Sequence, residues 1–336
     1  MSETNKAPKK PTIYDVAAVA GVSKSLVSLV MRDDPSVSEP RRDAVLAAIK
    51  KLNYRPSRYA QQLASHKTRS VGVLITDYKN LSFVNVLKGL REVLDDAGYQ
   101  VIISDIHRSP NFSEDPVDAF VSMEVEGIVF IAEPAGLRTK NLNIPTVMIG
   151  GRETLIEGSD LVSSDDSEGT RLVLEHLSGL GHRNIAHLTG VGGIAANRRN
   201  SYVKQMKSRG FKPVVFGHSQ PTTEIGGYLG AKELLASGEK FTAIYAANDY
   251  MAAGAISALK EQNLSVPKDV SVVGYDNAPI SSDFVLKLSS VDDMGIAIGR
   301  NAATLILERA NETKKAAPRV VLLKPDLVVR KSTKKI

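Results

Sequence analysis

Polar side chains that could hydrogen-bond a small molecule stand where several predicted strands end. These strands are short apolar runs, a pattern typical of strands buried on both faces of a parallel sheet. Ligands of such sheets bind outside the carboxyl ends of the strands. By this rule the sequence predicts a binding site among seven residues, which are Thr76, Asp77, Gly150, Asn248, Asp249, Tyr275 and Asp276.

The predicted strands form two successive series separated by amphipathic helices. The first series comprises 71–75, 101–104, 127–132 and 146–150, and the second comprises 184–189, 213–216, 243–247 and 270–276. Two βαβ series favour an α/β domain of two Rossmann-like lobes with a cleft between them. The predicted ligand-binding positions would face that cleft.

The first 69 residues carry the excess positive charge of the chain. They contain 13 Lys and Arg against six Asp and Glu, a net charge of +7, whereas the whole chain of 336 residues has a net charge of +6. A basic segment on a nearly neutral body is typical of DNA binding, because each neutralised phosphate releases condensed counterions. The alternative is a disordered basic tail, which the apolar pattern within the segment disfavours.

Three short helices are predicted within this basic segment. Thr12 can cap the first, Ser23 the second and Ser38 the third, and Gly21 ends the first. Two short helices around a glycine, closed by a third, are typical of a helix-turn-helix. The alternative is a three-helix bundle that binds another protein.

The second helix of a helix-turn-helix enters the major groove with its N-terminus first. Lys24 and Ser25 would then face base edges, whereas Thr12, Tyr14 and Ser23 would lie near phosphates.

The run PTIYDVAAVAGVSKSLVSLVMRDDPSVSEPRRDAVLAAIKKLNYRPSRYAQQLA resembles the DNA-binding headpiece of the LacI family of bacterial transcription regulators. The resemblance extends from Pro11 to Arg330. It implies a small all-α helix-turn-helix headpiece and an α/β, periplasmic-binding-protein-like effector domain of two Rossmann-like lobes. With it, the predicted DNA-binding residues are Thr12, Tyr14, Ser23, Lys24, Ser25, Ser28, Ser57 and Leu63.

In that family the segment that matches 57–64 is a hinge that becomes helical on DNA. The resemblance implies that Leu63 from each of two subunits is inserted into the minor groove, where an apolar wedge kinks the duplex. The chain departs from the family at Leu26 and Leu29, where Thr and Arg are common. Loss of that Arg removes a contact to guanine or phosphate, so a different operator preference is expected.

Three further runs, DDSEGTRLVLEHLSGLGHRNIAHLTG, IYAANDYMAAGAISAL and VSVVGYDN, are similar to the effector-domain motifs of the family. They imply that Arg198, Asn248 and Asp276 contact the effector. The predicted effector site comprises Thr76, Asp77, Phe83, Gly150, Arg198, Asn248 and Asp276.

The expected effector is a sugar or sugar alcohol, because such donors and acceptors can hydrogen-bond hydroxyl groups. Thr222 or Thr223 occupies the position where the family often has an aromatic ring, and Gly150 replaces an aspartate of some sugar-responsive members. A nucleobase, a sugar phosphate or the absence of a diffusible effector therefore remain alternatives.

The predicted domains are a disordered tail (1–10), a headpiece (11–56), a hinge helix or linker (57–69), and an effector-binding and dimerisation domain (70–336). Within the last, one lobe would comprise approximately 70–164 and 291–318, and the other 165–290 and 319–331. The helix over 295–309 is expected to return to the first lobe.

The residues disfavour catalysis. The chain has no cysteine, and Gly190, Gly192 and Gly193 do not fit the spacing of a dinucleotide-binding loop. His182 and His187 are five residues apart, which suits neither a helical nor a strand metal pair, so structural roles are expected. We expect no enzyme activity, cofactor or metal ion.

The expected partners are double-stranded operator DNA, a small-molecule effector and a second copy of the chain, since a two-fold operator requires a two-fold dimer. No apolar stretch suits a membrane span, and a cytoplasmic location is expected. The alternative function is a transport-type binding protein without a DNA-binding role, which the basic headpiece disfavours.

Overall fold

The computed structural model describes residues 11–54, 67–76, 78, 81–106, 115–140, 142–312 and 316–336. The chain divides into two compact units, Met1–Thr68 and Arg69–Ile336. The predicted tail (1–10) and most of the predicted hinge, including Ser57 and Leu63, lie outside the described residues, and so does Asp77.

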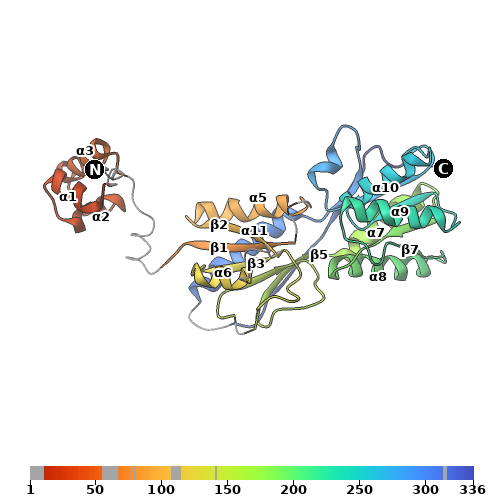
Figure 1. Cartoon of the computed structure of the whole chain (residues 1–336), viewed down its shortest axis with the longest axis horizontal. Coiled ribbons are helices and arrows are strands. Elements are labelled where there is room, and N and C mark those ends of the chain that lie inside the picture. The colour runs from red at the N-terminus through yellow and green to blue at the C-terminus, as the bar shows by residue number, and fades with distance from the viewer. Residues whose placement is uncertain are drawn as a thin grey trace, which may run out of the picture. The chain divides into compact units, whose positions relative to one another are not determined.

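The first unit, the headpiece, contains three helices around a small core (Figure 1). They are α1 (Ile13–Ala20), α2 (Lys24–Met31) and α3 (Glu39–Leu52). The α1 and α2 axes meet at 102°, which lies within the range of helix-turn-helix pairs. Its fully buried side chains include Val16 of α1, Val27 of α2 and Val45 of α3. The three helices predicted from the sequence are therefore confirmed.

Local hydrogen bonds fix the ends of these helices. The Asp15 carboxylate accepts hydrogen bonds from the Thr12 backbone N–H and hydroxyl, both at 2.7 Å. Gly21 ends α1 in the left-handed conformation with φ of +67°, which a glycine adopts without strain. The Ser23 hydroxyl accepts a hydrogen bond from the Leu26 N–H and so caps α2.

The second unit consists of two α/β lobes. The first lobe has a parallel six-stranded sheet in the order β11-β5-β4-β3-β1-β2. Its strands are β1 (Ser70–Ile75), β2 (Gln100–Asp105), β3 (Gly127–Phe130), β4 (Thr146–Ile149), β5 (Asp160–Ser164) and β11 (Val320–Leu323). Helices α5 (Phe83–Asp96) and α11 (Gly295–Asn311) cover one face, and α6 (Pro116–Ser122) packs on the other.

The second lobe has a six-stranded sheet in the order β12-β10-β9-β8-β6-β7, parallel except for β12. Its strands are β6 (Ile185–Leu188), β7 (Val214–Phe216), β8 (Ala243–Ala246), β9 (Ser271–Tyr275), β10 (Ser289–Asp292) and β12 (Asp326–Val328). The helices are α7 (Asp166–Gly179), α8 (Gly193–Ser208), α9 (Glu224–Ala236) and α10 (Asp249–Glu261), with a 3-10 turn at Pro279–Ser282.

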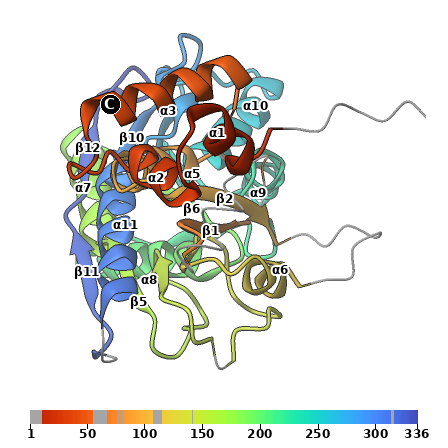
Figure 2. The same ribbon diagram turned by 90° about the vertical axis from the view of Figure 1, so that its left-hand side faces the viewer.

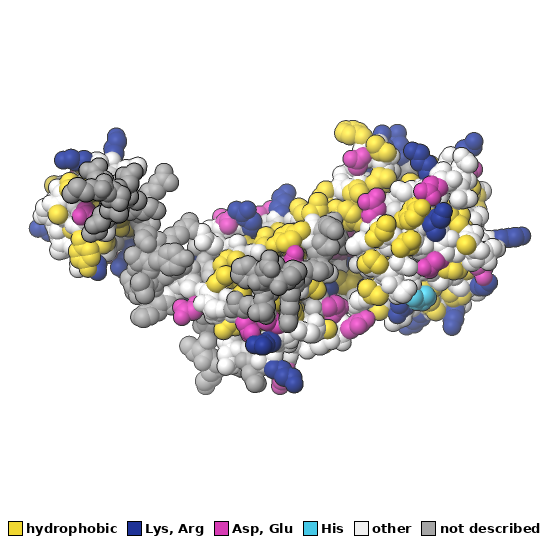
Figure 3. Space-filling view, in the orientation of Figure 1, with side chains coloured by type: hydrophobic (Ala, Val, Ile, Leu, Met, Phe, Trp, Pro, Cys, Tyr) yellow, Lys and Arg dark blue, Asp and Glu magenta, His cyan; other side chains and the backbone are white. Residues whose placement is uncertain are grey.

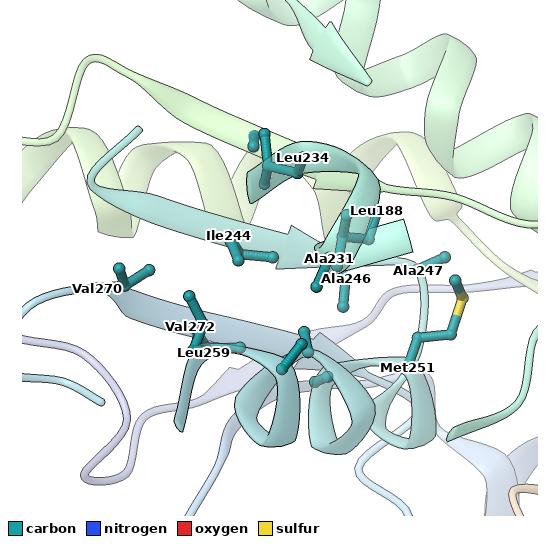
Figure 4. Packing of buried hydrophobic residues seen from close by; sticks show 14 of the residues in the cluster. Leu188, Ala231, Leu234, Ile244, Ala246, Ala247, Met251, Leu259, Val270 and Val272 are labelled. Atoms are coloured by element: carbon teal, nitrogen blue, oxygen red, sulfur yellow. The ribbon is translucent and has the colours of Figure 1, made fainter. Parts of the chain in front are cut away.

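Helices α7 and α8 pack on one face of the second sheet, and α9 and α10 pack on the other. Figure 4 shows Leu234 of α9 and Met251 and Leu259 of α10 around the strands that carry Ile244 and Val272. These side chains are fully buried. Burial on both faces explains why the strands are continuous apolar runs rather than alternating ones.

Each lobe contains a pair of helices that approach closely at glycine. In the first lobe, a Cβ on Gly89 of α5 would lie 1.9 Å from the carbonyl oxygen of Ile296 in α11. A Cβ on Gly299 of α11 would lie 2.1 Å from the carbonyl oxygen of Val86 in α5. In the second lobe, a Cβ on Gly254 of α10 would lie 1.9 Å from the Glu224 carbonyl oxygen of α9. A side chain at these positions would force the helices apart.

The chain crosses between the lobes three times, after β5, after β10 and after β11. Two crossings lie side by side, since the Asp165 N–H donates to the Leu323 carbonyl at 2.9 Å. The third leads through Met294, which has φ of +65°, into α11. Helix α11 packs on α5 in the first lobe, as predicted (Figure 2).

The predicted lobe boundaries require a correction. The sequence predicts that 319–331 belongs to the second lobe, but β11 pairs with β5 at the edge of the first sheet, and only β12 joins the second sheet. Similarly, β10 extends to Asp292 in the second sheet, beyond the predicted boundary at 290. Two short strands on either side of Lys324 and Pro325 look alike in sequence, and only pairing at the sheet edges distinguishes them.

Within the described ranges, no single helix is long and apolar enough to cross a membrane. The bent pair α1 and α2 passes that test only when the two are taken together.

Candidate functional site

The exposed surface of the headpiece brings together the predicted DNA-binding residues at the start of α2. Ser23, Lys24 and Ser25 are exposed, as is Thr12 before α1. Tyr14 is 65% exposed, and the Lys24 ammonium lies 5.3 Å from the centre of its ring. Lysine and arginine side chains also lie on the visible surface of this unit (Figure 3). This end of α2 can therefore offer hydroxyl and ammonium donors to a nucleic acid.

The other face of α2 packs into the headpiece. Ser28 is half-buried, and Leu26 and Leu29 pack against the headpiece core. The two leucines at which the chain departs from the family pattern therefore help to stabilise the helix position. Ser57 and Leu63 lie outside the described residues.

A cleft of about 330 Å³ lies between the two lobes of the second unit. Its size is at the lower end of the range for small-molecule sites, which is roughly 300–1,000 Å³. Both lobes contribute to its wall. The lining residues that carry charge or a hydrogen-bonding side chain are Thr76, Ser82, Glu133, Arg152, Arg198, Thr222, Thr223, Asn248, Asp276 and Asp293.

Arg198 is the centre of a buried ion-pair network on the wall formed by the second lobe. Its Nε donates to Asp166 Oδ1 at 2.9 Å, and one Nη donates to Asp276 Oδ1 at 2.8 Å and to the Ala247 carbonyl at 2.6 Å. Its guanidinium lies 3.5 Å from the centre of the Tyr275 ring. Arg198 is held from four sides, so its orientation is fixed before any ligand binds.

Burial and charge act in opposite directions on this network. Burial alone would lower the pKa of Arg198, but Asp276 and Asp166 outweigh it and raise that pKa well above its usual value. Burial raises the pKa of Asp276, although Arg198 opposes the shift. Arg198 therefore stays charged across the physiological range.

Asn248 lines the cleft and also caps α10. Its side-chain oxygen accepts a hydrogen bond from the Met251 N–H at 2.8 Å, and its amide nitrogen donates to the Thr222 carbonyl at 2.9 Å. Asn248 consequently holds the segment that carries Thr222 against the cleft. One amide hydrogen and one oxygen lone pair remain for a ligand.

Asp249, which follows Asn248, turns away from the cleft. Its carboxylate accepts hydrogen bonds from the Ser290 hydroxyl at 2.6 Å and from the Ala278 N–H at 2.7 Å. It is fully buried and does not line the cleft. Of the two polar residues after β8, Asn248 therefore faces the cleft. Asp249 instead connects the loop that follows β9 with strand β10.

The wall formed by the first lobe carries two charged residues that the sequence analysis missed. Glu133 follows β3 and Arg152 follows β4. The Glu133 carboxylate accepts a hydrogen bond from the Gly193 N–H at 2.9 Å and so contacts the first turn of α8 in the second lobe. Arg152 donates to the Ile131 carbonyl at 2.5 Å. The rule that ligands bind at the carboxyl ends of strands would have found both residues. Glu133 directly follows the predicted strand 127–132, and Arg152 lies two residues after the predicted strand 146–150.

Both residues keep a buried atom that has no hydrogen-bond partner in the part of the chain that the structure describes, namely Glu133 Oε2 and Arg152 Nε. Burial lowers the pKa of Arg152 to about 10, and Glu133 partly opposes the shift. Unpaired buried polar atoms are rare in folded proteins, and at the wall of a cleft a bound molecule can complete the pairing.

The structure places the remaining predicted residues as follows. Thr76 and Phe83 line the cleft. Gly150 does not, because Ile194 of α8 lies over it, and a Cβ on Gly150 would be 2.6 Å from Ile194 Cδ1. Asp77 lies outside the described residues.

His182 and His187, both in the second lobe, have structural contacts. His182 hydrogen-bonds Thr242 Oγ1 at 2.8 Å and the Lys334 carbonyl at 3.1 Å. His187 hydrogen-bonds the Tyr245 carbonyl at 2.9 Å, and burial lowers its pKa to about 3. The part of the chain that the structure describes holds no group of three or more side chains suited to a metal ion.

Known proteins match the chain in both units. Residues 12–57 match the model of bacterial regulatory proteins of the lacI family, and residues 174–333 match the model of the periplasmic binding protein-like domain. The HTH-type transcriptional repressor PurR of Pasteurella multocida is 30% identical over 335 residues, covering 96% of this chain and 98% of the relative. The chain belongs to the LacI family.

Solved structures agree with this membership. The Lac repressor dimer bound to operator and the anti-inducer ONPF is 28% identical, with a TM-score of 0.81 over 97% of this chain and all of that one. The complex of the transcriptional regulator CelR with cellobiose is 25% identical, with a TM-score of 0.69 over 96% of this chain and 99% of that one. The fold predicted from the sequence is confirmed, and this LacI-family member is a DNA-binding transcriptional repressor.

Proposed function

We propose that this repressor binds a two-fold symmetric operator as a homodimer and that a sugar or sugar alcohol in the cleft controls its affinity for DNA. The observation that carries the proposal is the Arg198 network, which fixes a donor and an acceptor at a cleft bounded by two lobes. We place this action in the cytoplasm, where the DNA of a bacterium lies.

The headpiece supports operator binding through the exposed start of α2. Lys24 and Ser25 can reach base edges in the major groove, while Ser23 and Tyr14 can reach phosphates. The solved Lac repressor is a dimer bound to operator. Two headpieces related by a two-fold axis would read two half-sites, so the operator should be palindromic.

Exposed apolar side chains support a dimer. Leu81, just before α5, is 42% exposed, and Val84, in the first turn of α5, is 36% exposed. Phe284 and Val285, in the loop before β10, are 88% and 90% exposed. Apolar side chains of this prominence favour contact with another protein surface, and a second copy of the chain is the partner that operator symmetry requires.

The polar atoms that remain available in the cleft support a hydroxyl-rich effector. Arg198 Nη2 and Asp276 Oδ2 have no hydrogen-bond partner among the described residues. A donor and an acceptor at neighbouring positions suit vicinal hydroxyl groups, each of which can donate and accept. The related CelR is solved with cellobiose.

Control of DNA binding would operate through lobe closure. Both lobes line the cleft, and three crossings connect them. An effector that contacts both lobes binds one lobe orientation more tightly than another and shifts the equilibrium by that difference in affinity. The direction in which the lobes shift then sets whether operator binding is strengthened or weakened.

The test begins with operator selection. Full-length protein selects duplexes from a random library, and the selected site is footprinted while sedimentation measures the oligomeric state. Two symmetric half-sites bound by a dimer are expected. A single asymmetric half-site bound by a monomer would contradict the proposal.

The effector is then tested with a panel of sugars, polyols, nucleobases and sugar phosphates. A ligand that binds only the folded protein raises its melting temperature by mass action. The same ligand should change operator affinity in wild type and leave it unchanged in Asp276→Asn. A nucleobase or sugar phosphate as the sole active compound would replace the sugar in the proposal.

A further inference from the structure

Asp293 is a charged residue of the cleft that the proposed function does not use. It lies on the crossing from β10 to α11 and lines the cavity. No described residue forms a hydrogen bond or an ion pair with its carboxylate. Because Asp293 lies on a segment that connects the two lobes, a ligand bound to either lobe can contact its carboxylate.

The described residues that line the cleft carry unequal charges. They include three carboxylates, those of Glu133, Asp276 and Asp293, and the guanidinium groups of Arg152 and Arg198. Arg198 is already shared between Asp276 and a further carboxylate outside the lining, Asp166. The positive charge of Arg198 is therefore more than matched before Asp293 is counted.

Arg152 interacts electrostatically with Glu133, but no hydrogen bond joins the two side chains. It forms no ion pair within 4.0 Å of a described carboxylate, and it donates instead to the Ile131 carbonyl. Glu133 Oε2 is buried and has no partner. Glu133, Asp276 and Asp293 thus offer the cavity oxygen atoms that no described residue satisfies, and a ligand with several hydrogen-bond donors would satisfy them.

We propose that the effector carries a cationic amine, as an amino sugar or an amino polyol does, and that its ammonium group binds the Asp293 carboxylate. The inference rests on the proposed role of the cleft as the effector site and names the chemical class of the effector. An ammonium group has three donors, which suit Asp293 together with the unpaired oxygen of Asp276 or Glu133. Hydroxyl groups of the same ligand would bind Arg198 and Asn248.

The electrostatics of the cleft agree with this geometry. Burial and the neighbouring Asp276 raise the pKa of Asp293 well above its usual value. Among the described residues, the nearby charged groups Asp276, Asp292 and Asp166 act in the same direction on this pKa, and Arg198 opposes them. Binding of an ammonium group should reverse the shift, so Asp293 releases a proton when the ligand binds.

The experiment compares sugars in matched pairs on full-length protein. Isothermal titration measures glucosamine against glucose, galactosamine against galactose, mannosamine against mannose, and glucamine against sorbitol. At least one amino compound should bind tenfold or more tightly than its hydroxyl partner. Its N-acetyl form, which lacks the charge, should lose that advantage. Titration in buffers with different ionisation enthalpies should show proton release.

Asp293→Asn supplies the residue-specific test. The variant should lose the preference for the amino compound while its melting temperature without ligand stays the same or rises, because a repelled carboxylate has been removed. Asp96→Asn, an exposed carboxylate of α5, is the matched control and should keep the preference.

Two results would overturn the inference. One is that no amino compound binds more tightly than its hydroxyl partner, and the other is that Asp293→Asn keeps the preference. Neither result touches the proposed function, which is tested separately by operator selection and by the response of operator affinity to a ligand of the cleft.

Discussion

The headpiece and the cleft obtain their functional side chains in opposite ways. In the headpiece, Thr12 to Ser25 lie within 14 consecutive positions, are largely exposed, and are held by hydrogen bonds between residues three apart. In the cleft, Arg198 is 5% exposed, and its partners Asp166 and Asp276 lie 32 and 78 positions away along the chain.

This difference separates recognition from stability. An exposed side chain in water contributes little to folding, so its substitution chiefly changes what the surface binds. A buried charge in a region of low dielectric constant is costly once its partner is lost, so its substitution changes the fold as well. The cleft should therefore be far more sensitive than the headpiece surface.

Arg198→Met should show the largest effect. It leaves the Asp166 and Asp276 carboxylates buried without their cation, which should lower the free energy of unfolding by about 3–5 kcal/mol. Urea denaturation measures this loss. Adding Asp276→Asn should restore part of it, whereas Arg199→Met, at the adjacent position, should have little effect. Equal losses in Arg198→Met and Arg199→Met would contradict the network.

Lys24→Ala should show the next largest effect, on DNA rather than on folding. The variant should bind its operator more weakly by about 1–3 kcal/mol, with unchanged unfolding and unchanged effector binding. Fluorescence anisotropy at several salt concentrations measures the loss, and a reduced salt dependence would mark a phosphate contact. Lys260→Ala, an exposed lysine of α10, is the control. A loss of stability in Lys24→Ala would break the contrast between the two regions.

The pH dependence of stability should sharpen the contrast within the cleft. Because the folded-state pKa of Asp293 is raised, the native state binds more protons than the unfolded chain between the usual pKa of an aspartate and the raised one. Its contribution to stability is therefore complete at acid pH and is lost as the pH rises through the raised pKa. The slope of this pH dependence reflects the difference in bound protons between the folded and unfolded states, and Asp293→Asn should lower that difference by at most one proton. Urea denaturation across pH measures the slope. An unchanged slope would contradict the raised pKa.

Ser23→Ala should show the smallest effect. It removes the hydrogen bond that caps α2, which should lower the stability of that helix by about 1 kcal/mol. Hydrogen exchange of the amides of α2 measures the loss. Protection in the lobes should not change, and a change there would show that the two units do not unfold separately.

Much of the fold could be predicted from the sequence, because the decisive signals are local. Helix α1 ends at Gly21 since glycine adopts a positive φ without strain, and Asp15 lies at the one position from which it can reach back to Thr12. Apolar runs bounded by turn residues identified β1 to β4 and β6 to β9. The carboxyl-end rule placed Thr76, Asn248 and Asp276 at the cleft.

The tertiary structure alone decided what depends on neighbours that are distant in sequence. Nothing local distinguishes Asn248, which faces the cleft, from Asp249, which turns away, or shows that β11 and β12 belong to different sheets. The pairing of Arg198, and the lack of a partner for Asp293 among the described residues, follow from which loops the two sheets bring together. Sequence determines which charges are present, and folding determines which of them are buried, paired or left for a ligand.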